Sequence, residues 1–348
     1  MPLGCYPTPV MRMRSAERAA GLAPDVELWC KRDDLTSALY GGNKVRKLER
    51  LIDEAHARGA GRLLTVGAVG SHHVLATALY GKRSGLRVEA VLVPQPWTQH
   101  VEDVARVDMS LGVVPFPVAG YASVPLVVAR RLAARKLPPA YFISPGGSSV
   151  TGSLGYVDAA HELAEQLARG DLPRPRSIVV ALGSGGTVAG LLVGLLREGL
   201  LVSSSAGPAI EVVAAQVVDP PLASGAATLA LALAIRRRLH ERLDRASIAT
   251  LSRSLRVVTG HLGKGYGQPT HAGARATEVA AGDEITLDAT YTGKAFAAAL
   301  DEARALGSGP ILYWHTLAAP GPLAALLQDA PPIEAVDRKV RALMRGAP

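Results

Sequence analysis

Aromatic residues and cysteine are scarce in this chain of 348 residues. Phe, Trp and Tyr make up 4% of it, so Val, Leu, Ile and Ala must fill most of the core volume. There are two cysteines, Cys5 and Cys30, too few for a disulfide framework. The N-terminus lacks a basic region followed by an apolar run and a cleavage site. These absences argue against a secreted disulfide-rich protein and favour the cytoplasm.

Long apolar runs and the spacings of common catalytic motifs are also missing. The longest apolar stretch, residues 178–202, is interrupted by glycines and by Arg197 and Glu198, so we expect no membrane span there. The nine histidines show no His-x-x-x-His spacing and the cysteines no Cys-x-x-Cys spacing, which argues against a metal site. Because no Gly-x-Ser-x-Gly motif occurs, nothing supports a serine hydrolase.

The net charge of +8 is spread along the chain. The densest basic run, residues 236–238, adjoins an apolar helical stretch, so we interpret it as a solvated helix face. We therefore expect no nucleic-acid partner. A diffuse positive field would still attract anionic ligands.

Short apolar runs alternate with helical patterns over most of the chain. We expect strands at residues 63–66, 88–93, 141–143, 178–182, 212–216, 256–259 and 311–314. We expect helices at residues 44–57, 72–84, 152–168, 187–197, 228–243 and 295–306. This alternation predicts an α/β fold with mostly parallel sheets flanked by helices.

A glycine-rich turn follows one predicted strand and begins an apolar helix. It consists of Gly183, Ser184, Gly185, Gly186 and Thr187. Backbone N–H groups of such a turn converge on an anion, and the helix N-terminus adds a positive dipole. No Lys follows the last glycine, so it is not a Walker loop. Taken alone, the turn is either a phosphate cup or simply a tight strand-to-helix connection.

Gly41, Gly42 and Asn43 precede Lys44, which begins another predicted helix. The helix dipole and the nearby Arg46 and Lys47 disfavour an ammonium at Lys44. A neutral amine is what Schiff-base formation needs. On its own, however, Lys44 is more simply a surface lysine.

Taken together, the polar motifs carry more information than any one of them. In chain order they are Lys31-Arg32-Asp33-Asp34-Leu35-Thr36, Gly41-Gly42-Asn43-Lys44, Gly70-Ser71-His72-His73, Gly146-Gly147-Ser148, Gly152-x-x-Gly155-Tyr156, Gly183-Ser184-Gly185-Gly186-Thr187, Gly265-Tyr266-Gly267, Tyr291-Thr292-Gly293-Lys294 and His315-Thr316. The set resembles the D-cysteine desulfhydrase and aminocyclopropane-carboxylate deaminase family, enzymes of the tryptophan-synthase-β type that use pyridoxal 5′-phosphate (PLP). The resemblance extends from about Lys31 to about Pro322.

The resemblance implies a set of cofactor ligands. Lys44 matches the lysine that holds PLP as a Schiff base and moves the α-proton. Asn43, the residue before it, is expected to bind the cofactor as well. Residues 183–187 match the cup for the cofactor's phosphate. Thr292 and Thr316 match positions near the pyridine nitrogen.

The resemblance also implies residues that act on the substrate, a small amino acid. Ser71 matches a serine that faces the substrate and takes part in proton transfer. His72 and His73 would meet the substrate carboxylate. Tyr266 and Tyr291 match two active-site tyrosines.

The residue at position 292 bears on the reaction type. The deaminases carry Glu there, and a carboxylate at the pyridine nitrogen keeps it protonated, whereas the hydroxyl of Thr292 leaves it nearly neutral. We therefore expect α,β-elimination of the desulfhydrase kind, giving a keto acid and ammonia. Two departures from the family leave alternatives open: His72 replaces an Asn that reaches the cofactor's phenolic oxygen, and Leu317 replaces a Gly. The alternatives are an aminocyclopropane-carboxylate deaminase, a β-replacement enzyme or a PLP-binding protein with little catalysis.

The expected architecture is the two-domain PLP fold type II. Residues 1–47 and 146–348 would form the large PLP-binding domain, and residues 48–145 a small α/β domain with four short strands. PLP would lie in the cleft between the two. The resemblance further implies a homodimer.

Overall fold

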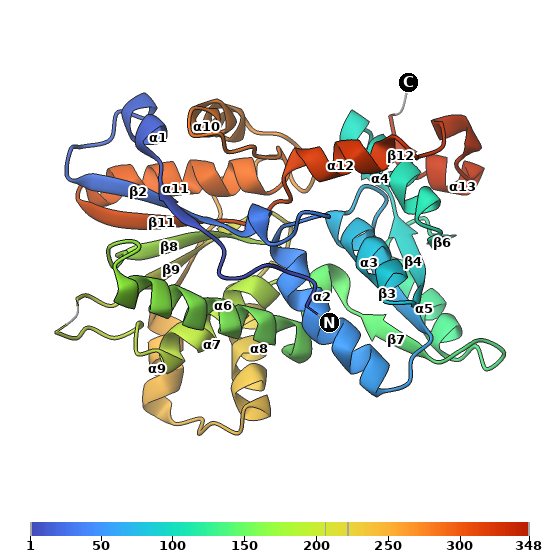
Figure 1. The fold of residues 1–348 in the computed structure, drawn as a ribbon, viewed down its shortest axis with the longest axis horizontal. Helices are drawn as coiled ribbons and strands as arrows, with labels where there is room; N and C mark the ends of the chain where they lie inside the picture. The colour runs from blue at the N-terminus through green and yellow to red at the C-terminus, as the bar shows by residue number, and fades with distance from the viewer. Residues whose placement is uncertain (1, 206, 221–222, 347–348) are drawn as a thin grey trace. The chain divides into compact units, whose positions relative to one another are not determined.

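The computed structural model describes residues 2–205, 207–220 and 223–346. The chain divides into two compact units (Figure 1). Unit 1 comprises Met1–Leu3, Lys44–Gly152 and Pro320–Pro348, and unit 2 comprises Gly4–Asn43 and Ser153–Ala319. Each unit has its own parallel sheet, so each is described by itself.

Unit 2 contains a six-stranded sheet. Its strands are β1 (Val10–Arg12), β2 (Val26–Arg32), β8 (Ser177–Leu182), β9 (Glu211–Gln216), β10 (Leu255–Val258) and β11 (Gly309–His315). The strand order is β1-β2-β11-β8-β9-β10, and every pair is parallel except β1 with β2. The carboxyl ends of β2, β11, β8 and β9 therefore share one edge, where ligands bind in sheets of this kind.

Helices cover both faces of this sheet, as Figure 1 shows. They are α1 (Arg14–Ala19), α6 (Val150–Arg169), α7 (Gly186–Arg197), α8 (Gly225–Arg238), α9 (Arg245–Arg253), α10 (His271–Ala281) and α11 (Thr292–Leu306). Alternate residues of the central strands point to opposite faces. Val179 and Tyr313 thus join a core with α1, α10 and α11, while Val180 and Trp314 join a second core with α6, α7 and α9.

Unit 1 contains a four-stranded sheet in the order β6-β4-β3-β7, all parallel. The strands are β3 (Arg62–Ala68), β4 (Arg87–Val93), β6 (Val114–Pro117) and β7 (Ala140–Ile143), and the helices are α2 (Asn43–Ala57), α3 (His72–Arg83), α4 (Gln99–Ser110) and α5 (Val124–Leu132). Residues 63–66 of β3 are almost fully buried, as a parallel strand covered on both faces must be.

The C-terminal segment groups with unit 1. It contains α12 (Pro320–Leu327), α13 (Arg338–Arg341) and β12 (Met344–Arg345), and β12 pairs with β5 (Gln95–Pro96). Arg106 Nε also donates to the Pro331 carbonyl over 2.7 Å. The short 3₁₀ helices of the chain are η1 (Asp33–Leu35), η2 (Tyr121–Ser123), η3 (Pro145–Gly147) and η4 (Ile333–Ala335).

The α/β fold class predicted from the sequence is confirmed, and every predicted strand and helix is present. The prediction for residues 228–243 was too long, because α8 ends at Arg238 and His240 adopts a positive φ of 58°. Asp244 then caps α9 by accepting from Ser247 N. The contact boundaries fall after residues 43 and 152, where we expected domain limits at residues 47 and 145, and residues 320–348 group with unit 1.

Candidate active site

The turn between β8 and α7 in unit 2 has the form of an anion cup. Gly185 precedes α7 with a φ of 81°, a left-handed conformation that favours glycine. A Cβ there would lie 2.9 Å from Thr228 Oγ1, and that hydroxyl is fixed by a bond to the Ser224 carbonyl. The N-cap residue Gly185 makes no side-chain cap hydrogen bond to α7. The start of α7 therefore borders a turn whose N-cap residue carries no side chain, as suits phosphate binding.

Asn43 is attached to this cup from another part of unit 2. Its Nδ2 donates to Thr187 Oγ1 over 3.2 Å, and its backbone N–H donates to the Thr316 carbonyl over 3.0 Å. The preceding Gly42 donates to the Asp33 carbonyl and accepts from Thr36 Oγ1. A Cβ on Gly42 would lie 2.9 Å from the Thr316 carbonyl oxygen, so only glycine fits. Asn43 is thus held between the end of β11 and the start of α7.

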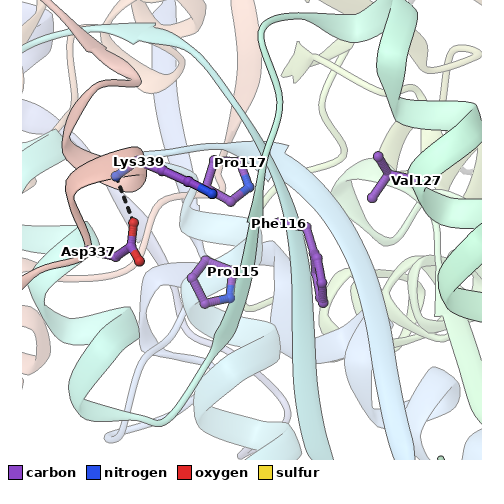
Figure 2. A pocket seen from close by; sticks show the side chains of 6 residues that line it. All are labelled: Pro115, Phe116, Pro117, Val127, Asp337 and Lys339. Carbon is purple, nitrogen blue, oxygen red and sulfur yellow. Dashed lines mark hydrogen bonds between the residues drawn. The ribbon is translucent and has the colours of Figure 1, made fainter. Parts of the chain in front are cut away.

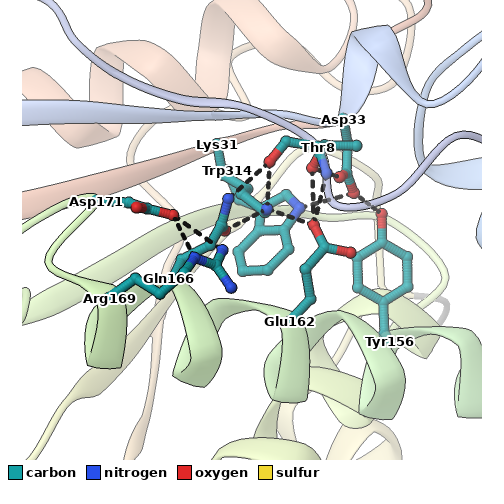
Figure 3. Close-up of polar contacts among 9 residues, drawn as sticks. All are labelled: Thr8, Lys31, Asp33, Tyr156, Glu162, Gln166, Arg169, Asp171 and Trp314. Carbon is teal, nitrogen blue, oxygen red and sulfur yellow. Dashed lines mark hydrogen bonds and ion pairs between the residues drawn. The ribbon is translucent and has the colours of Figure 1, made fainter.

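A buried polar network fixes the strand that leads into this loop (Figure 3). Its members are Thr8, Lys31, Asp33, Tyr156, Glu162, Gln166 and Trp314. Lys31 Nζ donates to the Thr8 carbonyl, to Gln166 and to Glu162. The Asp33 carboxylate accepts from Thr8, Tyr156 and Trp314. Because both charges are fully hydrogen-bonded, their burial is tolerated, and the Asp33 carbonyl that holds Gly42 stays in a fixed position.

Two predicted tyrosines meet beside the cup. Tyr266 Oη and Tyr291 Oη are 2.7 Å apart, and their rings pack edge to face at 5.8 Å. A Cβ on Gly183 would lie 4.0 Å from Tyr291 Cε1, so the tyrosine pair borders the turn. The structure therefore brings together the glycine-rich turn, Tyr266 and Tyr291, three separate parts of the predicted site.

Thr292 and Thr316 differ in how their hydroxyls are used. Thr292 Oγ1 donates to Asp288 Oδ1 over 2.6 Å and accepts from Asp288 N over 2.8 Å. The same carboxylate accepts from the backbone N–H groups of Thr290, Tyr291 and Thr292, so it caps α11. The Thr316 hydroxyl has no hydrogen-bond partner within the described residues, although its side chain is buried. Of the two, Thr316 has its hydroxyl proton available for a ligand.

The end of β11 is a low-dielectric environment. His315 is buried, and burial lowers its pKa to about 4, so the ring is neutral. Tyr313 Oη donates to the Thr292 carbonyl over 3.2 Å, and burial raises the pKa of that phenol. Hydrogen bonds and charges of a ligand at this edge are therefore strengthened relative to water.

The remaining predicted site residues, Lys44, Ser71, His72 and His73, belong to unit 1. Lys44 is the second residue of α2 and is half-buried. Burial lowers the pKa of Lys47 well below its usual value, and the charge of Lys44 lowers it further. Lys47 Nζ donates to the Gly146 carbonyl over 3.2 Å and to Ser148 Oγ over 3.3 Å. Two lysines of neighbouring helical turns thus share one partly desolvated region of unit 1.

Ser71 caps α3, since its Oγ accepts from His73 N over 3.2 Å. The His73 ring is buried and bonds Thr65 Oγ1 through Nε2 over 2.8 Å. Thr65 donates its proton to the Ile143 carbonyl, so Nε2 must carry the histidine proton and Nδ1 is an acceptor, without a partner among the described residues. Burial lowers the pKa of His73, with Lys44 and Lys47 adding to the effect. The ring therefore presents only an acceptor at Nδ1, so its side chain does not donate a hydrogen bond to the predicted substrate carboxylate.

His72 lies next to Ser71 and its ring stacks on His100, with centroids 4.5 Å apart. We expected this residue to replace an Asn of the family, and the tilted ring contact gives the larger side chain a defined place. The part of the chain that the structure describes contains no group of three or more His, Cys, Asp or Glu suited to a metal ion. In the same residues no helix is both long and apolar enough to cross a membrane.

Unit 1 also contains a cavity of about 340 Å³ (Figure 2). It is lined by Pro115, Phe116, Pro117, Val127, Asp337 and Lys339. Asp337 Oδ1 accepts from the backbone N–H of Lys339 over 2.7 Å. None of the predicted site residues contributes to its walls, so we assign it no part in the chemistry.

Sequence reasoning missed Asp288, which caps α11, and also Asp219 and Lys294, which bond to the loop that carries Tyr266. Asp288 had a readable signal, because an acidic residue just before a predicted helix is typical of an N-terminal cap. Lys294 belongs to the Tyr291-Thr292-Gly293-Lys294 motif but was given no role. Asp219 follows β9 in a loop, where the sequence alone does not indicate what it contacts.

Comparisons with known proteins agree with the fold and the motifs. The family model described as "Pyridoxal-phosphate dependent enzyme" matches residues 1–316. A D-cysteine desulfhydrase of Salmonella paratyphi A is 34% identical over 308 residues, which cover 85% of this chain and 88% of the relative. A solved structure described as an ACC deaminase homologue has a TM-score of 0.74 and 31% identity, and covers 93% of this chain and 95% of its own. A PLP-dependent aspartate racemase, with a TM-score of 0.60 and 16% identity, shares the fold alone.

Proposed function

Because the chain belongs to the pyridoxal-phosphate dependent enzyme family, we propose that it removes a β-substituent from a small amino acid and releases a keto acid and ammonia. The family match confirms that the chain is an enzyme and that PLP is its cofactor. The relatives named D-cysteine desulfhydrase and ACC deaminase homologue support elimination and deamination chemistry. D-Cysteine is the first candidate substrate.

The residues present fit the cofactor. Phosphate suits the turn of residues 183–187, where Gly185 leaves room that a Cβ would fill and is itself the N-cap residue of α7. Asn43, bonded to Thr187, continues this cup and precedes Lys44 directly in the chain. We assign Lys44 Nζ the covalent attachment of the cofactor, which requires its neutral amine.

When bound, PLP withdraws electrons from the α-carbon of an attached amino acid, and the protein supplies the proton transfers. We assign removal of the α-proton to Lys44 Nζ. The Ser71 hydroxyl, together with a tyrosine that takes its proton, is the second candidate for this step, and its oxygen is held at the α3 N-terminus by the His73 N–H. The shared hydroxyls of Tyr266 and Tyr291 would hold or deliver a proton at the leaving group.

We assign the hydrogen bond to the pyridine nitrogen to Thr316. The Thr292 hydroxyl proton is bonded to Asp288, whereas the Thr316 hydroxyl has no partner among the residues described. A neutral hydroxyl there leaves the nitrogen nearly uncharged, which suits elimination, because the departing β-group carries electrons away.

The observation that carries the proposal is the meeting of the cup and the tyrosine pair at one edge of the sheet. Gly183 belongs to the cup and lies against the Tyr291 ring, and Tyr291 shares a hydroxyl bond with Tyr266. A site that holds an anionic group next to two phenols can bind a phosphorylated cofactor and move protons beside it.

The substrate is tested by measuring keto acid and ammonia from the PLP-loaded protein, with D-cysteine and aminocyclopropane carboxylate assayed side by side. Pyruvate and sulfide from D-cysteine alone support the proposal. Oxobutyrate from the cyclopropane substrate supports the ACC deaminase alternative and contradicts the weight placed on position 292. If neither substrate gives keto acid or ammonia while the cofactor stays bound, the proposed substrate class is contradicted. That result favours a β-replacement enzyme or a PLP-binding protein with little catalysis.

The role of Lys44 is tested separately by Lys44→Ala, with exposed Lys136→Ala as the control. Borohydride reduction followed by peptide mapping should find the cofactor on residue 44 in the wild type and in the control. Lys44→Ala should lose that label and its turnover. Full turnover by Lys44→Ala would contradict the mechanism.

Two further assignments complete the proposal. We infer a cytoplasmic enzyme, supported by the unpaired thiols of Cys5 and Cys30. We also infer a homodimer, supported by the family resemblance. Sedimentation of the PLP-loaded protein at a mass of one chain would contradict the dimer.

A further inference from the structure

A buried lysine lies at the start of α11, beside the tyrosine pair. Lys294 is 0% exposed, and its Nζ donates to the Leu262 carbonyl over 2.8 Å and to the Gly265 carbonyl over 3.2 Å. Both carbonyls belong to the loop between β10 and α10, which carries Tyr266. A buried ammonium requires such acceptors, and the two carbonyls are in turn held in place by the ammonium. Lys294 therefore ties the Tyr266 loop to the helix that begins just after Tyr291.

Two carboxylates complete this arrangement, one for each tyrosine. Asp219 Oδ2 accepts from Tyr266 N over 2.9 Å, and Asp288 Oδ2 accepts from Tyr291 N over 3.0 Å. Burial lowers the pKa of Lys294, while the charges of Asp219 and Asp288 act in the opposite direction and favour its ammonium. The two anions thus hold the tyrosine backbones and stabilise the cation between the same elements.

We propose that Asp219, Lys294 and Asp288 form a charged frame that positions the hydroxyl pair of Tyr266 and Tyr291 for proton transfer. In this frame Lys294 is a positioning residue, since it contacts the loop and helix that carry the tyrosines. The inference rests on the proposed function, in which that hydroxyl pair serves the reaction.

The loop needs such a frame because its own backbone is permissive. Gly263, Gly265 and Gly267 all have positive φ values, between 68° and 123°. Glycines in these conformations lose more conformational entropy on ordering than other residues do. Contacts from outside the loop must therefore hold it, and Lys294 and Asp219 provide three of them. A shift of about 1 Å at a reacting group costs about 100-fold in rate.

The first test is Lys294→Met, which keeps the length of the side chain and removes its charge and both bonds. We expect kcat to fall by about 100-fold and KM to change by less than about threefold, with the cofactor still attached at Lys44. Amide hydrogen exchange in residues 262–267 should accelerate. Lys264→Met is the matched control, because Lys264 is an exposed lysine of the same loop. Its kcat and loop exchange should match the wild type.

The second test is Asp219→Asn, which spares the core because Asp219 is exposed. We expect faster exchange at the Tyr266 amide and a fall in kcat of about tenfold, since a bond to a charged acceptor becomes a neutral one. If Lys294→Met does not fold, this variant decides the question. Wild-type exchange and kcat in the variants that fold would overturn the proposal. Hydrogen exchange is independent of turnover, so it judges the frame even if the Lys44→Ala test contradicts the proposed function.

Discussion

Two strand-to-helix turns of the same kind, one in each unit, have opposite N-terminal chemistry. The β8–α7 turn in unit 2 ends in Gly185, which has no side chain to cap α7. The β3–α3 turn in unit 1 ends in Ser71, whose side chain caps its own helix. The first turn suits an anion such as the phosphate of PLP. The second presents a hydroxyl whose oxygen is fixed and whose proton remains to be donated. The two turns thus give an anion cup or a proton donor according to the residue at the N-cap, which is left-handed at Gly185 and extended at Ser71.

The largest effect should come from closing the uncapped turn with Gly185→Ala. The new Cβ would lie 2.9 Å from Thr228 Oγ1, so the turn must shift. Its backbone N–H groups would then no longer point toward the phosphate. Losing about 3 kcal/mol of bonds to a charged group corresponds to a 100-fold weaker affinity for PLP. Gly199→Ala is the control, because Gly199 also has a positive φ, 68°, but nothing lies within 4 Å of its Cβ position. Both variants should show similar backbone strain in thermal unfolding, and equal PLP titrations would contradict the phosphate cup.

The capped turn is tested by Ser71→Ala. The variant should lose about 1 kcal/mol of stability with its cap and about 100-fold in kcat with its hydroxyl. Thr98→Ala separates the two effects, since Thr98 caps α4 in the same unit by accepting from Val101 N. It should lose similar stability in urea unfolding and keep its kcat. A Ser71→Ala enzyme with wild-type kcat would reduce Ser71 to a structural cap.

A third comparison concerns acid stability, through the neutral His315. Its folded pKa of about 4 lies below the unfolded value, so the unfolded chain binds more protons at intermediate pH. This contribution to stability is complete above the unfolded pKa and is lost as the pH falls toward 4. Between pH 7 and pH 5 it amounts to about 2 kcal/mol. His315→Gln should flatten the pH dependence of urea unfolding by that amount, whereas the exposed His161→Gln should leave most of it. An unchanged slope in His315→Gln would show that protonation of His315 is not the cause.

Strand and helix positions could be predicted because parallel strands buried on both faces read as unbroken apolar runs. Residues 178–182 and 212–216 are examples, and both are strands of the six-stranded sheet. β2 was not predicted, because its sequence, Val-Glu-Leu-Trp-Cys-Lys-Arg, contains charged residues. One of them, Lys31, is fully buried, and its partners Thr8, Glu162 and Gln166 are distant in sequence. Long-range pairing of buried charges cannot be read from local pattern.

The chemistry of the site, like the fold, could be predicted from the sequence only in part. The motifs indicate which residue types gather, and Gly183, Tyr266 and Tyr291 do lie together. They do not indicate protonation states or which hydroxyl is already bonded. The neutral His73 ring and the Asp288 bond to Thr292 both depend on burial and geometry, which appear only in the folded chain.

The smallest effects should separate the two threonines at the unit 2 site. Thr292→Val removes a bond to the half-buried Asp288 carboxylate and should cost about 2 kcal/mol of stability. Thr316→Val removes a hydroxyl with no partner in the described residues, so stability should change by less than about 1 kcal/mol. If Thr316 contacts the pyridine nitrogen, its loss should lower kcat by about fivefold, the value of one neutral hydrogen bond. It should also shift the visible absorbance of the bound cofactor.

Stability is followed by urea unfolding and the cofactor by absorbance in the same samples. The reverse pattern, a cofactor shift in Thr292→Val that is absent from Thr316→Val, would assign the nitrogen contact to Thr292, and Asp288 would then act on the cofactor through that hydroxyl.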